Sequence, residues 1–229
     1  MTPRGGLYPI VLRLDGRRAL VVGGGKVAAR RVGGLLEAGA RVVVVSPRFA
    51  PGFRRLVATR GVACIERSYR LDDVTGADLA IAATDDREVN ARVRSDARQA
   101  GVPVCVVDDP EHSDFIVPAV VRRGDFLLAI SSGGASPGLV GQLRRELDLL
   151  VPEDAAVLVR LLARARLQVR GAVADPDRRR DLLTRVLSVD LLAALRAGGD
   201  EAVARLIDDL IARPAGPRPA PAEARPADG

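Results

Sequence analysis

Three glycines near the N-terminus follow an apolar run in a pattern that can bind a phosphate group. Residues 23–28 match the motif G-x-G-x-x-A, between a β-branched run and a helical pattern. Gly23 would permit a tight turn, and Gly25 would let the backbone approach a pyrophosphate. Ala28 would keep the helix close to the strand, and the N-terminus of that helix favours an anion. The motif predicts a dinucleotide site, but a glycine-rich turn without a ligand could have the same sequence.

The second predicted strand lacks the acidic residue that usually holds the ribose of NAD at its end. Instead, Val45 is followed by Ser46, Pro47 and Arg48. Ser46 or backbone groups could bind the ribose. Arg48 could also favour the 2′-phosphate of NADP, or it could be an ordinary loop arginine.

Two adjacent carboxylates follow a later strand, which we expect over 102–107. Ligands of open parallel sheets bind beyond the carboxyl ends of the strands, so Asp108 and Asp109 would face the cofactor crevice. A carboxylate placed there could remove a proton while a hydride leaves for a nicotinamide. Alternatively, both aspartates only end the strand before Pro110.

A Ser-Ser-Gly-Gly segment at 131–134 precedes a predicted helix that starts at Pro137. Its amides and hydroxyls, with Ser132 and Gly133 at its centre, could bind an anionic group of a substrate, or the segment could be a flexible turn. His112 is the only histidine, and we interpret it as a surface residue rather than a metal ligand. We predict no metal site, since the two cysteines lack metal-ligand spacing.

The elements that must position these residues alternate between strand and helix over the first hundred residues. Alternation of this kind indicates parallel strands with right-handed crossovers, and therefore an α/β fold with a Rossmann-like doubly wound sheet. We expect a hairpin around Arg123-Gly124. From Pro152 to Arg213 we expect helices alone, with Gly198-Gly199 between the last two of them: Ala155–Val169, Arg178–Leu187, Val189–Arg196 and Glu201–Ile211. The predicted strands are Ala19–Val22, Arg41–Val45, Val62–Ile65, Leu79–Ala83, Val102–Val107, Phe115–Arg122 and Asp125–Ser131, and the first helices are Val27–Ala38, one after Pro51, and Arg87–Ala100.

We divide the chain into four parts on this basis. Residues 1–113 are expected to form the NAD-binding Rossmann domain, and residues 114–150 a small α+β dimerisation and substrate region. Residues 151–213 are expected to form a helical domain. The tail, 214–229, is rich in proline and is expected to be disordered.

Composition and charge narrow the classes of protein. No run of 18 apolar residues and no signal peptide is present, so we expect a cytoplasmic protein without a membrane span. The net charge of +6 would suit nucleic acid. However, the arginines are spread among acids, and aromatic side chains for base stacking are scarce. Residues 1–150 hold 22 basic and 17 acidic side chains, an excess that would equally suit a small polyanionic ligand.

Several separated motifs, in one order, resemble the precorrin-2 dehydrogenase/sirohydrochlorin ferrochelatase family, which includes the N-terminal half of siroheme synthase. The resemblance runs from about Leu7 to Leu150, with looser helical similarity to about Arg213. The motifs that carry it are Tyr8-Pro9-Ile10, Val22–Arg30, Ala82–Asp86 with Val89-Asn90, Val106-Val107-Asp108, Phe115–Pro118 and Ser131–Pro137.

The resemblance implies NAD-linked dehydrogenation of precorrin-2, a tetrapyrrole with eight carboxylates, by a homodimer. Asp108 matches the catalytic aspartate proposed for the family and becomes our preferred general base. Ser132 matches a serine near the substrate that is phosphorylated in some members. The resemblance also implies a dimer interface after Asp108 and a substrate cover from the helical part. The implied cofactor contacts are Lys26, Val27, Pro47, Arg48, Ala83 and Thr84.

Two departures and several alternatives remain open. Cys105 stands where some members have asparagine, and we expect no methyltransferase half. Insertion of Fe²⁺ into sirohydrochlorin occurs in only some members, and it would use carboxylates such as Asp108. A regulatory dimer that senses a dinucleotide without chemistry is the main alternative, and a nucleic-acid-binding protein is another.

Overall fold

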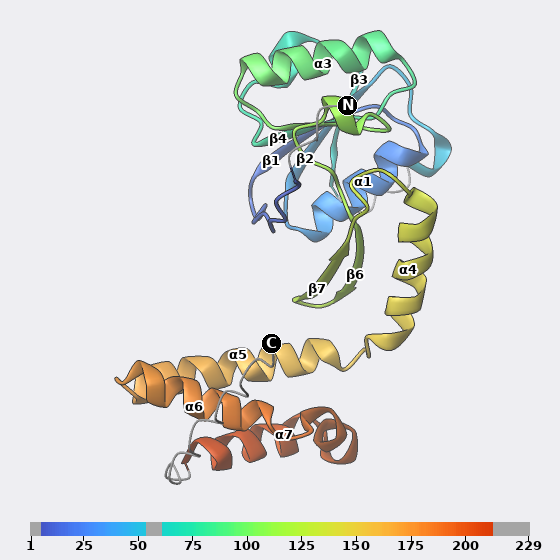
Figure 1. Cartoon of the computed structure of the whole chain (residues 1–229). Helices are drawn as coiled ribbons and strands as arrows, with labels where there is room; N and C mark the ends of the chain where they lie inside the picture. Colours follow the sequence, from blue (N-terminus) through green and yellow to red (C-terminus); the bar gives the residue numbers. More distant parts are fainter. Residues whose placement is uncertain (1–5, 54–60, 213–229) are drawn as a thin grey trace, which may run out of the picture. The chain divides into compact units, whose positions relative to one another are not determined.

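The computed structural model describes residues 6–53 and 61–212. Contacts between residues divide the chain into two compact units (Figure 1). The first unit runs to Pro118 and also contains Ser131–Pro137. The second unit contains Ala119–Ile130 and the chain from Gly138 onward. Residues 114–150 are therefore shared between the two units, and the predicted disordered tail lies outside the described residues.

The first unit is built on five parallel strands in the order β3-β2-β1-β4-β5. The order reverses at β1, which pairs with β2 on one side and with β4 on the other. This arrangement confirms the predicted doubly wound sheet. The strands are β1 (Arg18–Val22), β2 (Arg41–Ser46), β3 (Ala63–Glu66), β4 (Leu79–Ala82) and β5 (Val104–Val106).

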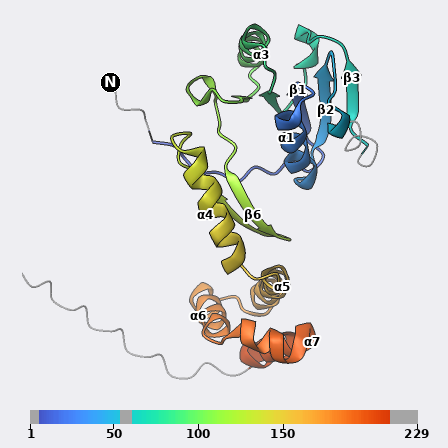
Figure 2. The ribbon, with the colours of Figure 1, turned by 90° about the vertical axis from the view of Figure 1, so that its right-hand side faces the viewer.

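Helices cover both faces of this sheet because successive side chains of each strand point to opposite sides. Ala19 and Val21 of β1 pack in the same core as α1 (Lys26–Glu37). Leu20 and Val22 pack in a second core, with α3 (Arg87–Gln99). Figures 1 and 2 show the two helices on opposite faces. Because both faces are buried, the strands are continuous apolar runs, which explains why sequence patterning could locate them.

Some local predictions differ from the structure. The strand expected from Phe115 begins only at β6 (Ala119–Arg123), because Phe115 and Val117 pack against the core that contains α1. Two short 3-10 turns, η1 (Leu71–Asp73) and η2 (Pro110–His112), were not predicted. The helix expected after Pro51 is described only to residue 53, and its continuation lies outside the described residues.

Among the described residues, the second unit contains the predicted hairpin and a set of helices. Strand β6 pairs antiparallel with β7 (Phe126–Ile130) around Gly124. A core that includes Ala165, Val186 and Ile207 joins α5, α6 and α7. The two helices predicted on either side of Gly198-Gly199 are both present. They are labelled together as α7, and the backbone between them leaves helical geometry at Gly199, where φ is +71°. The helices are α4 (Pro137–Leu150), α5 (Ala155–Ala172), α6 (Pro176–Leu187) and α7 (Leu191–Ala212). None of the described helices is both long enough and apolar enough to cross a bilayer.

An ion pair with a buried carboxylate stabilises the turn before β4. The carboxylate of Asp73 is 6% exposed and accepts hydrogen bonds from the Arg67 guanidinium, at 2.6 and 2.8 Å, and from the Arg70 amide, at 2.8 Å. The hydrogen bond from Arg67 is the main reason why the pKa of Asp73 lies below its ordinary value of 3.8. Ionised Asp73 therefore stabilises the folded state.

We expect Asp73→Ala to lower the free energy of unfolding at pH 7 by about 2 kcal/mol, because it leaves the Arg67 and Arg70 donors without their acceptor. Urea unfolding measures this effect, with Asp72→Ala, on the exposed side of the same turn, as control. The folded-state pKa is lowered, so the stabilisation is complete above 3.8 and is lost as the pH falls through the folded-state pKa. A difference between wild type and variant that stays constant down to pH 2 would contradict this explanation.

Candidate functional site

The glycine-rich loop lies at the carboxyl end of β1, between the ends of β2 and β4. The Gly23 amide donates to the Val45 carbonyl at 2.9 Å, and the Ala83 amide donates to the Val22 carbonyl at 2.8 Å. Gly23 has φ +127°, and a Cβ there would lie 2.3 Å from the Ala83 carbonyl oxygen. Only glycine suits this position, and its contact brings Ala83 and Thr84 beside the loop.

Gly24, which the sequence motif leaves unspecified, is as constrained as Gly23. A Cβ on Gly24 would lie 2.2 Å from the Arg48 carbonyl oxygen and 2.9 Å from the Ser46 hydroxyl. The Gly24 carbonyl accepts from the Ala50 amide at 2.9 Å. The middle glycine therefore joins the first loop to the end of β2. The run of three glycines was the signal for this role, but the contact itself joins residues more than 20 positions apart.

Gly25 and the start of α1 present an open surface with free amide donors. A Cβ on Gly25 would meet nothing within 4 Å. Gly25 caps α1 with extended backbone and no side-chain hydrogen bond, and the first turn contains no acidic residue. Lys26 is exposed and Val27 is half-buried. Open space, uncapped amides and a positive helix end are what a pyrophosphate requires, so these residues fit a dinucleotide.

The end of β2 is organised by Ser46. Its side chain is 5% exposed, and its hydroxyl donates to the Arg48 carbonyl at 2.7 Å. The hydroxyl proton is thus bonded within the turn. Pro47 and the Arg48 side chain, by contrast, are exposed. This geometry favours backbone groups or Arg48, rather than the Ser46 hydroxyl, as donors to a ribose or to a 2′-phosphate.

The turn after β4 is held by Asn90, which the sequence analysis quoted only as part of a motif. Asn90 is 8% exposed on α3. Its amide oxygen accepts from the Thr84 hydroxyl at 2.8 Å and from the Thr84 amide at 3.3 Å. Its amide nitrogen donates to the Thr84 carbonyl at 3.0 Å. Asn90 therefore fixes the backbone of Thr84 next to Gly23.

We expect Asn90→Ala to weaken NAD binding about three- to tenfold, because buried groups of Thr84 would lose their partners and the turn would loosen. Isothermal titration with NAD measures the affinity, and thermal unfolding measures the accompanying loss of stability. Gln99→Ala, at the exposed far end of the same helix, is the matched control. Equal affinities for wild type and Asn90→Ala would show that the turn does not contribute to the cofactor site.

Asp108 and Asp109 have different environments although they are neighbours. Asp109 caps η2: its carboxylate lies 2.8 Å from Nδ1 of His112 and accepts from the His112 amide at 3.3 Å. Asp108 is exposed, and its carboxylate makes no hydrogen bond or salt bridge to any residue that the structure describes. Asp108 is therefore the carboxylate that is free to react, whereas Asp109 and His112 stabilise the turn.

Asp108 is also held in an unusual backbone conformation. Its φ of +62° is the only positive φ of a non-glycine residue in the described part of the chain. Aspartate tolerates this region better than most residues, but at a cost of about 1 kcal/mol or more. The turn is stabilised by Ser113, whose hydroxyl accepts from the Val106 amide at 2.9 Å and lies 2.7 Å from the Asp109 carbonyl oxygen. Ser113 was not predicted to contribute to the site.

A second residue that the sequence analysis missed is Arg31, on α1. Its half-buried side chain interacts electrostatically with Cys105 and Asp108, and burial lowers its pKa. Its Nε atom is buried and has no hydrogen-bond partner among the described residues. Arg31 thus places a positive charge near the free carboxylate of Asp108. The neighbouring Cys105 is 5% exposed, and burial raises the pKa of its thiol.

The Ser-Ser-Gly-Gly segment belongs to the same compact unit as these strand ends. The Ser132 hydroxyl accepts from the Ser136 amide at 2.9 Å, and Gly133 and Gly134 have φ of +64° and +86°. A Cβ on Gly134 would lie 3.0 Å from Cγ of Pro110, the first residue of η2. This contact brings Ser132 and Gly133 toward the turn that contains Asp108.

The predicted site residues therefore meet at one edge of the first unit. The glycine loop, Ser46–Arg48, Ala83-Thr84 and Asp108 lie at the carboxyl ends of β1, β2, β4 and β5. Ligands of doubly wound sheets bind at this edge, where the strand order reverses. Groups of three or more histidine, cysteine or acidic residues that could hold a metal ion are not found in the described part of the chain.

Comparison with known proteins finds family models and relatives that match most of this chain. A family model described as "Putative NAD(P)-binding" matches residues 10–119, and a model of the sirohaem synthase dimerisation region matches residues 155–211. Siroheme synthase 1 of Aeromonas salmonicida is 41% identical over 209 residues, which are 91% of this chain and 45% of that protein. The siroheme synthase of Methylococcus capsulatus is 42% identical over 209 residues, 90% of this chain and 44% of that protein.

The chain belongs to the siroheme synthase and precorrin-2 dehydrogenase family. Among solved structures, "SirC, precorrin-2 dehydrogenase" matches with a TM-score of 0.74 and 27% identity, over 89% of this chain and all of that one. The chain spans less than half the length of the siroheme synthases that it resembles. The model described as a dimerisation region covers α5–α7, C-terminal to residues 114–150, so the assignment of dimerisation to those residues stays a prediction.

Proposed function

We propose that this chain oxidises precorrin-2 to sirohydrochlorin with NAD as hydride acceptor. The observation that carries the proposal is the free carboxylate of Asp108, at the same sheet edge as a glycine loop with the geometry of a dinucleotide site. A regulatory dimer without chemistry would need the glycine loop but not an unpaired carboxylate held in a strained turn. Membership of this family supports the dehydrogenase over that alternative.

The cofactor would be held by backbone groups more than by side chains. The amides at the start of α1 would bind the pyrophosphate, with Gly25 leaving room for it and Lys26 adding positive charge. Pro47, Arg48 and the Ala83-Thr84 turn would line the rest of the site. NAD supplies the hydride acceptor when bound. Arg48 is exposed and could bind the 2′-phosphate of NADP. Titration with NAD and with NADP measures which cofactor the site prefers.

Asp108 would act as the general base. Dehydrogenation removes two hydrogens from the macrocycle, one as a hydride and one as a proton, and Asp108 would take the proton. Arg31 would keep positive charge near that carboxylate, and together with Ser132 and Gly133 it would bind carboxylates of the tetrapyrrole. Ferrochelatase activity stays a prediction, in which Asp108 would accept the pyrrole protons as Fe²⁺ enters.

The deciding experiment is anaerobic incubation of the protein with enzymatically generated precorrin-2 and NAD. We expect reduced cofactor and the sirohydrochlorin spectrum to appear in equal amounts, and Fe²⁺ added afterwards tests chelation. The absence of turnover with both NAD and NADP, from folded protein that binds the cofactor, would refute the dehydrogenase and favour the regulatory alternative.

The assembly and location are proposed on the same basis. We expect a homodimer, which the match of residues 155–211 to a dimerisation region supports. Light scattering during size-exclusion chromatography measures the mass. We place the reaction in the cytoplasm, without a membrane or nucleic-acid partner.

A further inference from the structure

The second unit contains a pocket between α5 and α6 that the proposed reaction does not use. Its volume is about 560 Å³, which is within the usual range for small-molecule sites. Apolar side chains from both helices, among them Leu162, Val169 and Leu183, form its apolar part. Val169 is fully buried, so this part of the pocket is continuous with the packing of the helices.

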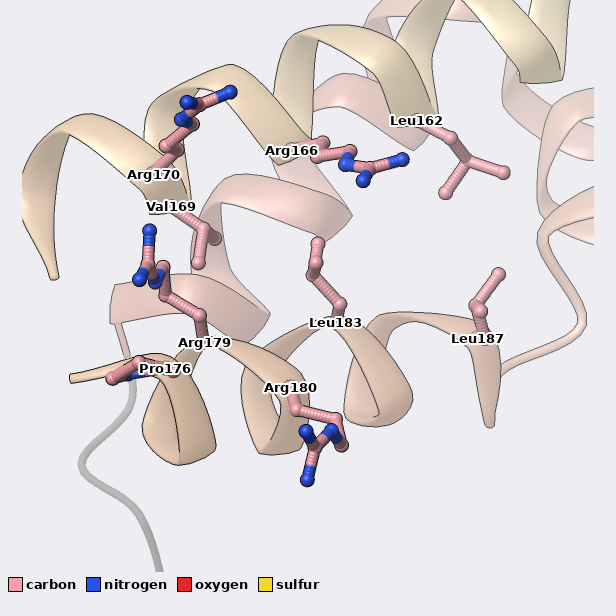
Figure 3. A pocket seen from close by; sticks show the side chains of 9 residues that line it. All are labelled: Leu162, Arg166, Val169, Arg170, Pro176, Arg179, Arg180, Leu183 and Leu187. Carbon is pink, nitrogen blue, oxygen red and sulfur yellow. The ribbon is translucent and has the colours of Figure 1, made fainter. Parts of the chain in front are cut away.

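Arginines supply the polar part of the pocket lining. Arg166 and Arg170 come from α5, and Arg179 and Arg180 come from α6, whereas none of the lining residues is acidic or aromatic. Figure 3 shows Arg166 and Arg179 extending toward the space between the helices, while Arg180 points away from it. Arg180 is paired with Asp177 at 3.1 Å, but Arg166 and Arg179 have no salt bridge within the described residues.

The position of these charges does not favour the fold. Arg166 and Arg170 are four residues apart on one helix, a spacing at which like charges repel. Arg179, on the other helix, adds a further positive charge that has no salt bridge within the described residues. A bound anion would reduce the repulsion among these arginines.

The lining also defines the chemistry of the anion. Guanidinium groups bind carboxylates through paired hydrogen bonds, and the leucines and valine offer an apolar surface. A nucleotide would find no aromatic side chain for its base in this lining, and a concave pocket does not suit the extended backbone of a nucleic acid. The lining therefore suits an organic molecule with an apolar body and several carboxylates.

We propose that the pocket between α5 and α6 is a second ligand site, which binds an amphipathic polycarboxylate. The tetrapyrroles of the proposed reaction have this chemistry, and only the choice of a tetrapyrrole as the ligand rests on the proposed function. A polycarboxylate without a large ring is the other source of the same chemistry. Its lining contains only apolar residues and arginines, with no acidic residue or histidine that could act as a general base, so it would hold or sense the ligand rather than transform it.

The test is fluorescence titration of the full chain with uroporphyrin, an octacarboxylate porphyrin, and with benzenehexacarboxylate as the ring-free probe. The double variant Arg166→Gln/Arg179→Gln removes one pocket charge from each helix. Its matched control, Arg164→Gln/Arg178→Gln, removes two exposed arginines from the same helices outside the pocket. A 20-base-pair DNA duplex is titrated in parallel, and light scattering follows the mass of each variant.

We expect the pocket variant to bind uroporphyrin about tenfold more weakly, equivalent to roughly 1.4 kcal/mol, while the control changes less than about twofold. Weak binding of benzenehexacarboxylate would identify the macrocycle as the ligand, and equally strong binding would identify a ring-free polyacid. Equal losses in both variants, or an effect only on DNA binding or on the mass of the oligomer, would overturn the proposal. Turnover of precorrin-2 is measured separately, so failure of the proposed reaction would not be mistaken for failure of this site.

Discussion

Asp108→Asn is expected to lower kcat for precorrin-2 dehydrogenation by about 10²- to 10⁴-fold, the usual contribution of a positioned general base. Asparagine accepts the positive φ of this position nearly as well as aspartate, so the fold and NAD affinity should be preserved. Stopped-flow measurement of NADH formation under anaerobic conditions gives kcat, and titration gives the affinity for NAD.

Two further variants separate chemistry from structure at this turn. Asp109→Asn removes charge from the carboxylate that pairs with His112, and it should lower the melting temperature while leaving kcat within about threefold. Asp108→Gly should be inactive yet more stable than wild type, by up to about 1 kcal/mol, because glycine adopts φ +62° without strain. If Asp108→Asn turns over at the wild-type rate, the base is another group and the proposed mechanism is wrong.

Gly25→Val is expected to abolish measurable NAD binding, with an affinity loss of at least about 100-fold, while the protein stays folded. The backbone of Gly25 is extended, and a Cβ there would contact no protein atom within 4 Å. A valine side chain would instead fill the space through which a pyrophosphate approaches the amides of α1. Isothermal titration with NAD and thermal unfolding measure the two quantities independently.

The neighbouring glycines provide controls of opposite kinds. Gly24→Ala should destabilise the protein itself, because its Cβ would lie 2.2 Å from the Arg48 carbonyl oxygen. Gly33→Ala, inside α1 and without neighbours within 4 Å, should leave NAD binding unchanged and add about 0.5–1 kcal/mol of stability. Normal NAD affinity in Gly25→Val would show that the dinucleotide does not approach this loop.

The sequence by itself was sufficient to predict the parallel sheet and the edge of that sheet at which the site lies. Strands buried on both faces are continuous apolar runs, and the helices between them have periodic apolar positions and glycine ends, so local patterns located β1, α1, β2, β4 and α3. Because the carboxyl ends of parallel strands share one edge, Gly23, Ser46 and Asp108 could be assigned to one edge before any contact was known. Thr84 was added to them only by the family resemblance. The family motifs in that order pointed to the same assignment.

Only the tertiary structure decided which of these side chains are free to act. Position along the chain did not distinguish Asp108 from Asp109, and only the family resemblance favoured Asp108. In the structure, η2 and His112 bind Asp109 and leave Asp108 unpaired in a strained turn. The Ser46 hydroxyl is used within its own turn, and Arg31 contributes a charge near Asp108 that no motif indicated.

The contacts that join the site also came from the tertiary structure alone. Asn90 holds Thr84, Gly24 rests on Arg48, and Gly134 rests on Pro110. Periodicity and turn chemistry describe a residue relative to its immediate neighbours in the chain. A hydrogen bond or a close approach between distant segments depends on how the strands and loops pack, so these contacts appear only when the chain is folded.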